Sequence, residues 1–225
     1  ISLAGGMREM VSRHALIRKL SSVETLGSVT VICSDKTGTL TQNQMTVTRL
    51  WTDGKTFSIT GSGYDPVGDF LLDDAKVDLQ DYPAARTALW IGTLNNDAQL
   101  EVTGESEGKI TYRMVGDPTE GSILVAAHKA GASARALNEA YPRLQEIPFD
   151  SDRKRMVTIN GLRNPSVEDI SPFAQSDRNK WHVIAVKGAP DVVLKLCAYK
   201  LRLDNSYEPL TEASRQEILE ANDAM

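Results

Sequence analysis

The sequence is poor in the residues that build disulfide frameworks and metal sites. Its 225 residues include two cysteines, Cys33 and Cys197, and three histidines, His14, His128 and His182. Two cysteines cannot form a disulfide framework, and they indicate a reducing compartment. The histidines are scattered without metal-ligand spacing, so we expect ordinary surface or half-buried positions for each of them.

Long apolar runs and basic excess are missing too. No run approaches the ~18–20 residues that span a bilayer, and no charged region precedes the apolar start, as a signal peptide would require. The net charge of −5 argues against a nucleic-acid binder. Apolar content of 41% is ordinary for a globular protein of one large or two modest domains. Because the chain starts with isoleucine inside an apolar stretch, we expect a piece of a longer protein.

Two patterns near the start predict regular structure. Residues 6–20 place apolar side chains at helical spacing with arginine and lysine between them, which predicts a basic amphipathic helix. It either packs on its own domain or forms a stalk leaving a membrane, and the sequence favours neither. Residues 28–35, SVTVICSD, predict a buried strand of the parallel-sheet type that ends at Asp35.

The rest of the chain alternates hairpins and helices, which predicts an α+β fold with an antiparallel sheet flanked by helices. Asp53-Gly54 predicts the turn of a hairpin over 45–60, and Asp117 with Pro118 predicts the start of a helix. The other expected elements are a hairpin over 98–116, helices over 84–94, 118–130 and 132–140, strands over 144–149, 153–161 and 180–190, a loop over 163–180, and helices starting at Pro190 and after Thr211.

Asp35 is the first candidate for chemistry. An aspartate at the carboxyl end of a buried strand stands where α/β sheets place their sites. Gly38 allows close backbone approach, and the turn with Lys36, Thr37 and Thr39 can direct N–H groups and a hydroxyl at a phosphate. Each feature alone is weak, because an aspartate at a strand end is more often a turn former or a helix cap.

The full heptapeptide DKTGTLT, residues 35–41, resembles the phosphorylation signature of the P-type ATPases, which are cation pumps that form an aspartyl phosphate. The motifs GDPTEGSILVAA, IPFDSDRKRM and VKGAPDVVL resemble, in the right order, those of the nucleotide-binding domain of the type II, calcium-pump-like members. The resemblance implies a stalk at 1–20, the first segment of a Rossmann-like, haloacid-dehalogenase-type phosphorylation domain at 21–45, and a nucleotide-binding domain at 46–225.

The same resemblance implies roles for residues of the signature. Asp35 would accept the γ-phosphate of ATP, and its carboxylate would hold Mg²⁺ together with the Thr37 carbonyl. Thr39 would contact the phosphoryl oxygens, with Lys36 close by. Soluble phosphatases of the wider superfamily have a second acid where Thr37 stands, which protonates the leaving group and later activates water. Thr37 therefore favours a pump over a phosphatase.

For the nucleotide pocket, the resemblance implies stacking of adenine on Phe149, Lys187 with Gly188 deep in the pocket, Glu120 near the adenine amino group, and Lys154 reaching the phosphates. Simpler interpretations are a core position for Phe149, a solvated surface for Lys154 and the third helical position for Glu120. Lys187 has no such simple interpretation, because burying a lysine at the end of a strand costs free energy unless the ammonium has a partner.

One departure concerns the phosphate contacts of the pocket. Ser151 stands where calcium pumps often have an arginine, which puts one phosphate contact in doubt, and Arg153 is a possible replacement.

The resemblance implies an ATP-binding and phosphorylation-site piece of a cation pump, with Ca²⁺ the favoured ion. Its cofactors would be ATP and Mg²⁺. Its partners would be the remaining phosphorylation, actuator and transmembrane domains of the parent chain, which place it in the cytoplasmic part of a membrane protein. We expect a monomer that binds ATP weakly without turnover, because the family's remaining catalytic motifs do not occur between Lys187 and Met225. The alternatives are a soluble phosphatase or phosphotransferase with an aspartate nucleophile, and an ATP-binding regulatory module.

Overall fold

The computed structural model describes all residues except 1, 17, 20, 107 and 163–181. The chain divides into two compact units, residues 1–43 and 44–225. The predicted loop over 163–180 lies outside the described residues.

The described part of the first unit contains α1 (Ser2–Ser12) and α2 (Ser21–Gly27). The single helix predicted over 6–20 is wrong in extent, because α1 ends at Ser12 and His14 takes a left-handed φ of 65°. The Ser12 hydroxyl donates to the Glu9 carbonyl at 2.7 Å, a local bond that competes with helix continuation. The helix α2 was not predicted.

The buried strand predicted over 28–35 is also wrong. These residues have no strand pairing and are all exposed, including Val31 at 71% and Ile32 at 86%. A β-strand satisfies its backbone groups through a neighbouring strand, and all the strands among the described residues belong to the second unit. The apolar run alone therefore predicted a strand without showing what it would pair with.

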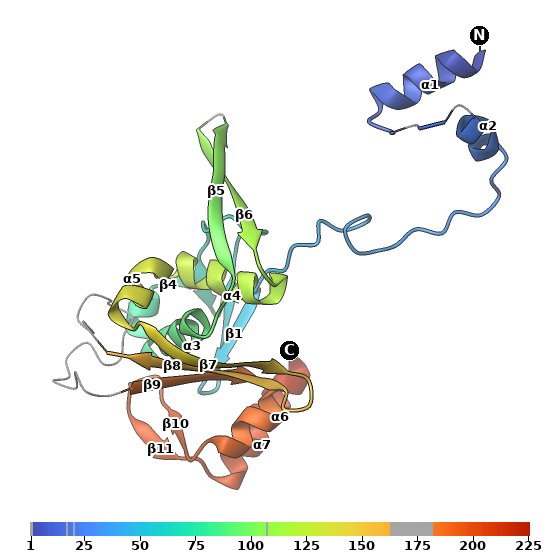
Figure 1. Cartoon of the computed structure of the whole chain (residues 1–225). Helices are drawn as coiled ribbons and strands as arrows, with labels where there is room; N and C mark the ends of the chain where they lie inside the picture. Colours follow the sequence, from blue (N-terminus) through green and yellow to red (C-terminus); the bar gives the residue numbers. More distant parts are fainter. Residues whose placement is uncertain (1, 17, 20, 107, 163–181) are drawn as a thin grey trace. The chain divides into compact units, whose positions relative to one another are not determined.

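The second unit is built from antiparallel sheets and helices, so the α+β prediction is confirmed (Figure 1). The strands are β1 (Arg49–Thr52), β2 (Lys55–Ile59), β3 (Phe70–Leu72) and β4 (Ala75–Val77) in one sheet, the hairpin β5 (Gln99–Ser106) and β6 (Lys109–Val115), the sheet β7 (Arg143–Asp150), β8 (Arg155–Gly161) and β9 (His182–Gly188), and the hairpin β10 (Tyr199–Leu201) and β11 (Tyr207–Pro209).

The α-helices of the second unit start within two residues of their predicted positions, whereas the two 3-10 turns were not predicted. The 3-10 turns are η1 (Leu79–Asp81) and η2 (Leu194–Leu196), and the α-helices are α3 (Pro83–Leu94), α4 (Pro118–Lys129), α5 (Ala134–Ala140), α6 (Pro190–Val193) and α7 (Glu212–Ala224). The Asp117 carboxylate accepts hydrogen bonds from the N–H groups of Thr119 and Glu120, and the Thr211 hydroxyl accepts one from Ser214. Both caps satisfy N–H groups that the first helical turn leaves free.

Of two hairpin turns in the first sheet, the sequence predicted the one between β1 and β2 but not the one between β3 and β4. Asp53 and Gly54 both have positive φ, 46° and 76°, as the predicted two-residue turn requires. Asp73 and Asp74 form the same kind of turn between β3 and β4, at φ 50° and 63°. This second hairpin was not predicted, because an Asp-Asp pair without glycine is a weaker turn signal.

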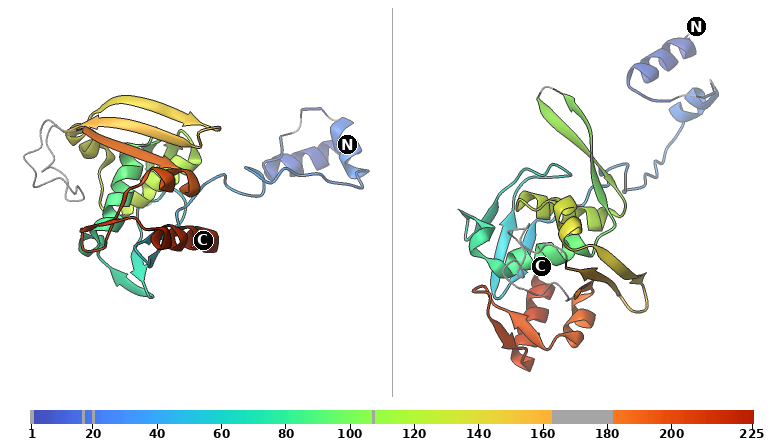
Figure 2. Two further views of the ribbon diagram at one scale, coloured as in Figure 1. Left: turned by 90° about the horizontal axis from the view of Figure 1, so that it is seen from below. Right: turned by 60° about the vertical axis from the view of Figure 1, so that its left-hand side comes forward.

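The helix α3 lies at the centre of the core. It contacts β1, α4, α5 and β9, and in both views of Figure 2 it lies between the sheet β1–β4 and the sheet β7–β9. Its Trp90 is 1% exposed and meets Tyr141 edge-to-face, with ring centroids 5.1 Å apart. Asn95, just after α3, donates to the carbonyls of Met156 at 3.0 Å and Ala185 at 2.8 Å, which ties the helix to β8 and β9.

Two further features of the described residues are a projecting hairpin and the length of the helices. The hairpin β5–β6 extends away from the rest of the second unit in Figures 1 and 2. Among the helices of the described ranges, none is long and apolar enough to cross a membrane.

Candidate functional site

A cavity of about 710 Å³ opens in the second unit where α4 begins and β9 ends. We call it the α4–β9 pocket and define it by its lining residues, Asp97, Asp117, Thr119, Glu120, Ile123, Phe149, Met156, Lys187 and Gly188. Four of the five predicted nucleotide-binding residues are therefore brought together: Glu120, Phe149, Lys187 and Gly188. An aromatic ring and apolar side chains beside a few convergent polar groups are typical of small-molecule sites.

An ion pair between Glu120 and Lys187 crosses the pocket. The Lys187 ammonium donates to Glu120 Oε1, and the two side chains are only 22% and 17% exposed. Lys187 lies in β9 opposite Met156 of β8, so the sheet fixes its position. The second carboxylate oxygen of Glu120 accepts the backbone N–H of Asp97 at 2.9 Å. The partner that the sequence required for Lys187 is thus Glu120.

The first turn of α4 supplies a second charged wall. Asp117 caps the helix, and its pKa is lowered mainly by the backbone N–H of Glu120. Burial works in the opposite direction, and the N–H of Thr119 lowers the pKa further. Hydrogen bonds to the ionised form stabilise the charge. The pocket therefore presents three carboxylates, those of Asp97, Asp117 and Glu120, against the one ammonium of Lys187.

Gly188 is needed where the turn between β7 and β8 packs against the end of β9. A Cβ atom added at Gly188 would lie 2.3 Å from the Lys154 carbonyl oxygen and 2.8 Å from Arg155 Cα. That carbonyl also accepts the N–H of Ala189 at 3.0 Å. Lys154 itself has a left-handed φ of 49° and is exposed. Its backbone thus shapes the pocket edge, although Lys154 is not among the lining residues.

The side chains at the end of β7 and on the β7–β8 turn differ in accessibility. Phe149 is 63% exposed, so it is not the core residue of the simpler interpretation, and its ring is available at the pocket. The Arg153 guanidinium donates to the Pro148 carbonyl at 3.0 Å. Ser151 is exposed. Arg153 thus uses one of its five N–H donors within its own turn.

The candidate phosphorylation residues form an exposed turn in the first unit. Asp35, Lys36, Thr37 and Thr39 are all exposed. The Lys36 carbonyl accepts hydrogen bonds from the N–H of Leu40 at 3.0 Å and of Thr41 at 3.2 Å, and Gly38 has a φ of 76°. The positive φ of Gly38 is a conformation that glycine adopts readily. Within the described residues no group of three or more His, Cys, Asp or Glu side chains is arranged to hold a metal ion.

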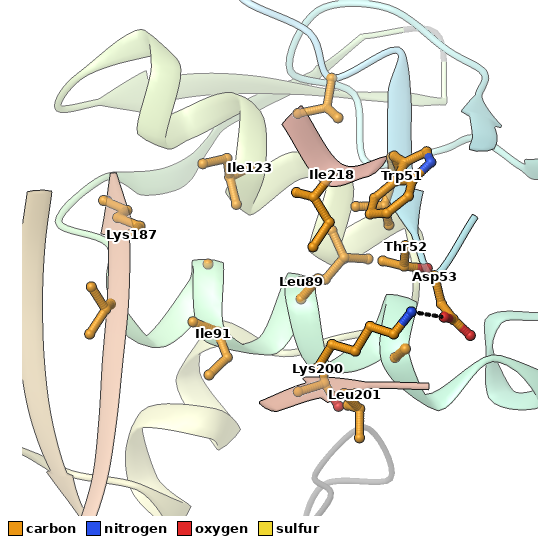
Figure 3. A pocket seen from close by; sticks show the side chains of 17 residues that line it. Trp51, Thr52, Asp53, Leu89, Ile91, Ile123, Lys187, Lys200, Leu201 and Ile218 are labelled. Carbon is orange, nitrogen blue, oxygen red and sulfur yellow. Dashed lines mark ion pairs between the residues drawn. The ribbon is translucent and has the colours of Figure 1, made fainter. Parts of the chain in front are cut away.

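A second cavity, of about 550 Å³, shares Lys187 and Ile123 with the α4–β9 pocket. Figure 3 shows its walls, formed by Trp51 of β1, Leu89 and Ile91 of α3, Ile218 of α7 and Lys187 of β9. At one end the Lys200 ammonium lies 3.6 Å from the Asp53 carboxylate. The walls of this cavity are mostly apolar, and its charged groups, Asp53, Lys187 and Lys200, are a minority of the lining.

Sequence reasoning missed Asp97, Asp117, Thr119, Ile123 and Met156 as residues of the pocket. Asp117 and Thr119 both precede Glu120 in GDPTEG; Asp117 was interpreted only as a helix cap, and Thr119 was not singled out. Asp97 carried no local signal, because it reaches the pocket through the loop after α3. Met156 stands opposite Lys187 in the β8–β9 register, so the strand pairing could have identified it.

The second unit is thus an α+β domain of antiparallel sheets and helices, with the α4–β9 pocket beside the sheet β7–β9. The sequence model of the family described as "P-type ATPase, cytoplasmic domain N" matches residues 84–225. The chain therefore belongs to the P-type ATPases.

Curated relatives agree with this family. The chain is 40% identical over 195 residues to "Calcium-transporting ATPase" of Bacillus subtilis, covering 87% of this chain and 20% of that protein. It is 42% identical over 217 residues to "Probable cation-transporting ATPase F" of Mycobacterium tuberculosis, covering 95% and 21%. It is also 34% identical over 198 residues to "Calcium-transporting ATPase type 2C member 1" of Bos taurus, covering 88% and 18%. The chain thus spans about a fifth of the length of these relatives.

Proposed function

We propose that this chain is the nucleotide-binding domain and phosphorylation-site segment of a cation pump. ATP binds in the α4–β9 pocket, and Asp35 receives its γ-phosphate in the longer protein. The observation that carries the proposal is the convergence of Glu120, Phe149, Lys187 and Gly188, from three separate stretches of sequence, on one pocket of a domain from this family. The cation is Ca²⁺ by preference, since two of the relatives above are named as calcium-transporting.

The pocket supports binding of the base through complementary chemistry. The exposed Phe149 ring offers a face for stacking, and Ile123 and Met156 offer apolar contact. The Glu120 carboxylate accepts hydrogen bonds, which suits the amino group of adenine. Because the pocket wall is rich in carboxylates, the triphosphate points out of it, towards the basic turn that contains Lys154.

In the phosphoryl transfer, a carboxylate oxygen of Asp35 attacks the γ-phosphorus in line. The bond between that phosphorus and the β,γ-bridging oxygen breaks, ADP leaves, and an acyl phosphate remains on Asp35. The exposure of Asp35 leaves it open to a nucleotide. Gly38 allows the backbone of the turn to come close to a phosphate, and Thr39 supplies a hydroxyl.

A magnesium ion would be held by the Asp35 carboxylate and the Thr37 carbonyl. This set fits Mg²⁺ bound largely by phosphates and water, since the ion commonly takes one or two protein carboxylates. Bound there, the ion would neutralise charge on the transferring phosphate. Thr37 has no acid to activate water, so the acyl phosphate is long-lived, which a pump requires and a phosphatase does not. The chain alone binds ATP without turnover.

The pocket is tested by titrating ATP into the chain and following backbone amide shifts. Phe149→Ala and Lys187→Met are each expected to weaken binding roughly tenfold. Tyr199→Ala is a matched control for Phe149, at 62% against 63% exposure. Lys200→Met is a matched control for Lys187, because Lys200 is an ion-paired lysine with an 18% exposed side chain. Equal losses in variants and controls would reject the pocket.

The phosphorylation is tested in the longer protein with γ-labelled ATP. We expect an acid-stable, hydroxylamine-sensitive phosphoprotein that depends on the transported cation and disappears in Asp35→Asn. Labelling that is independent of the cation would favour the phosphatase alternative. The absence of labelling would favour the remaining alternative, an ATP-binding regulatory module.

A further inference from the structure

The loop 94–97, which starts at the last residue of α3, is held by one side chain from a distant strand. Arg143, at the start of β7, donates from Nη2 to the carbonyls of Leu94 at 3.1 Å and Asn96 at 2.7 Å. Its Nη1 donates to the Asp97 carboxylate at 2.5 Å and to Glu146 at 2.8 Å. The planar guanidinium thus fixes the loop through three separate acceptors.

The same loop holds Glu120. The backbone N–H of Asp97 donates to Glu120 Oε2 at 2.9 Å, and the side-chain amide of Asn96 donates to the Glu120 carbonyl at 2.8 Å. Glu120 Oε1 is thereby left for Lys187. A continuous series of bonds therefore runs from Arg143 through the loop and Glu120 to Lys187.

The charge and burial of Arg143 suit this role. Its side chain is 25% exposed. Burial works against its charge, but the bonds and charges of Asp97 and Glu146 outweigh that cost and raise the pKa of Arg143 above its ordinary value. The guanidinium therefore stays charged at every working pH. Arg143 is absent from the lining of the pocket, so it has no direct contact to offer a ligand there.

We propose that Arg143 is a positioning residue of the α4–β9 pocket: by fixing the loop 94–97 it sets the orientation of Glu120 and, through Glu120, of Lys187. Without Arg143 the Asp97 N–H loses its fixed place. Glu120 then samples other rotamers, and the Lys187 ammonium loses a defined partner. The effect on the empty pocket is independent of the proposed function, whereas the effect on ATP affinity rests on it.

The experiment compares the wild-type chain with Arg143→Met and with a matched control, Arg135→Met. Arg135 also pairs with a glutamate, at 3.0 Å, but its side chain is 89% exposed and lies on α5. In the absence of nucleotide, Arg143→Met is expected to shift the NMR resonances of the Asp97 amide and of the Glu120 side-chain carboxyl carbon, and Arg135→Met to change neither. Unchanged Asp97 and Glu120 signals in a folded Arg143→Met would overturn the proposal, whatever the chain does with ATP.

A double-mutant cycle with ATP separates positioning from general stabilisation. Arg143→Met and Glu120→Gln are each expected to weaken ATP binding roughly tenfold. The double variant is expected to be no weaker than the worse single one, because both changes act on the same carboxylate. Additive losses would contradict the proposal. If the wild-type chain binds no ATP, the proposed function fails. The positioning role of Arg143 is then tested only by the NMR signals of Asp97 and Glu120 in the empty pocket.

Two milder variants apply if Arg143→Met does not fold. Arg143→Lys keeps the charge but cannot reach three acceptors at once, so it is expected to shift the Asp97 amide resonance in the same direction. Asp97→Asn removes the ion pair but keeps the backbone N–H and the two carbonyl bonds, so its effect on Glu120 is expected to be smaller than that of Arg143→Lys. The reverse order would show that Arg143 acts through charge, against the proposal.

Discussion

The two units of the chain differ in the specificity of their sequence motifs and in the burial of their side chains. Residues 35–41 of the first unit carry the most specific motif of the sequence, yet no residue of that unit with a described burial is buried. The second unit carries weaker individual motifs, but its core is continuous across both sheets and α3. The specificity of a motif and the extent of packing around it are therefore separate properties, and Asp35 is recognisable without a packed surrounding.

The largest expected effect is on the free energy of unfolding, and it comes from a substitution in the core of the second unit. Trp90→Ala removes a fully buried ring from α3 and leaves a cavity against Tyr141. We expect the free energy of unfolding of the second unit to fall by about 3–5 kcal/mol, as measured by urea denaturation. Ile32→Ala in the first unit is the control, and it should change unfolding by less than about 0.5 kcal/mol because Ile32 is 86% exposed. Similar losses in both variants would remove the contrast.

A smaller effect is expected where the pocket edge is most tightly packed. Gly188→Ala would force a Cβ atom to within 2.3 Å of the Lys154 carbonyl. We expect the β7–β8 turn to move, with a cost of about 1–3 kcal/mol and weaker ATP binding. Gly104→Ala is the control, because its nearest neighbour would be 3.6 Å away. An unchanged free energy of unfolding in Gly188→Ala would contradict this prediction, because it would show that the β7–β8 turn moves without loss of stability.

The helix cap of α4 predicts a smaller, pH-dependent effect. The lowered pKa of Asp117 means that its ionised form stabilises the fold above the ordinary value of 3.8, and that this contribution is lost as pH falls through the lowered folded value. Asp117→Ala is therefore expected to cost about 1 kcal/mol at pH 7 and less below the folded pKa, where the protonated carboxyl remains only a neutral acceptor for the cap. Asp117→Asn should keep the cap and lose only the pH dependence. A constant difference across pH would contradict this assignment.

The smallest effect concerns only accessibility. Cys33 in the first unit is exposed, whereas Cys197 in the second is half-buried and its thiol donates to the Val193 carbonyl at 3.4 Å. We expect one fast and one slow thiol in labelling with a thiol reagent, without change in stability. Cys33→Ser should remove the fast phase. Loss of the slow phase instead would reverse the order of exposure.

Much of the second unit could be predicted from local signals. The Asp53-Gly54 turn, the Asp117 cap and the paired strands around Lys187 each depend on neighbouring residues, and the structure has all of them. The strand over 28–35 failed because pairing depends on a partner that an apolar run cannot specify. Asp97 was missed for a related reason, since its place in the pocket depends on Arg143, 46 residues away.

The position of α3 in the chain has a consequence for synthesis. Asn95 is tied to Ala185, which is made 90 residues later. At roughly 5–20 residues per second, the apolar side of α3 that receives β9 waits on the order of 5–20 seconds for its covering strand. During that interval Leu94 and its neighbours are open to chaperones and to aggregation. Slower translation between residues 95 and 185 should therefore lower the yield of folded chain, even though the finished structure is unchanged.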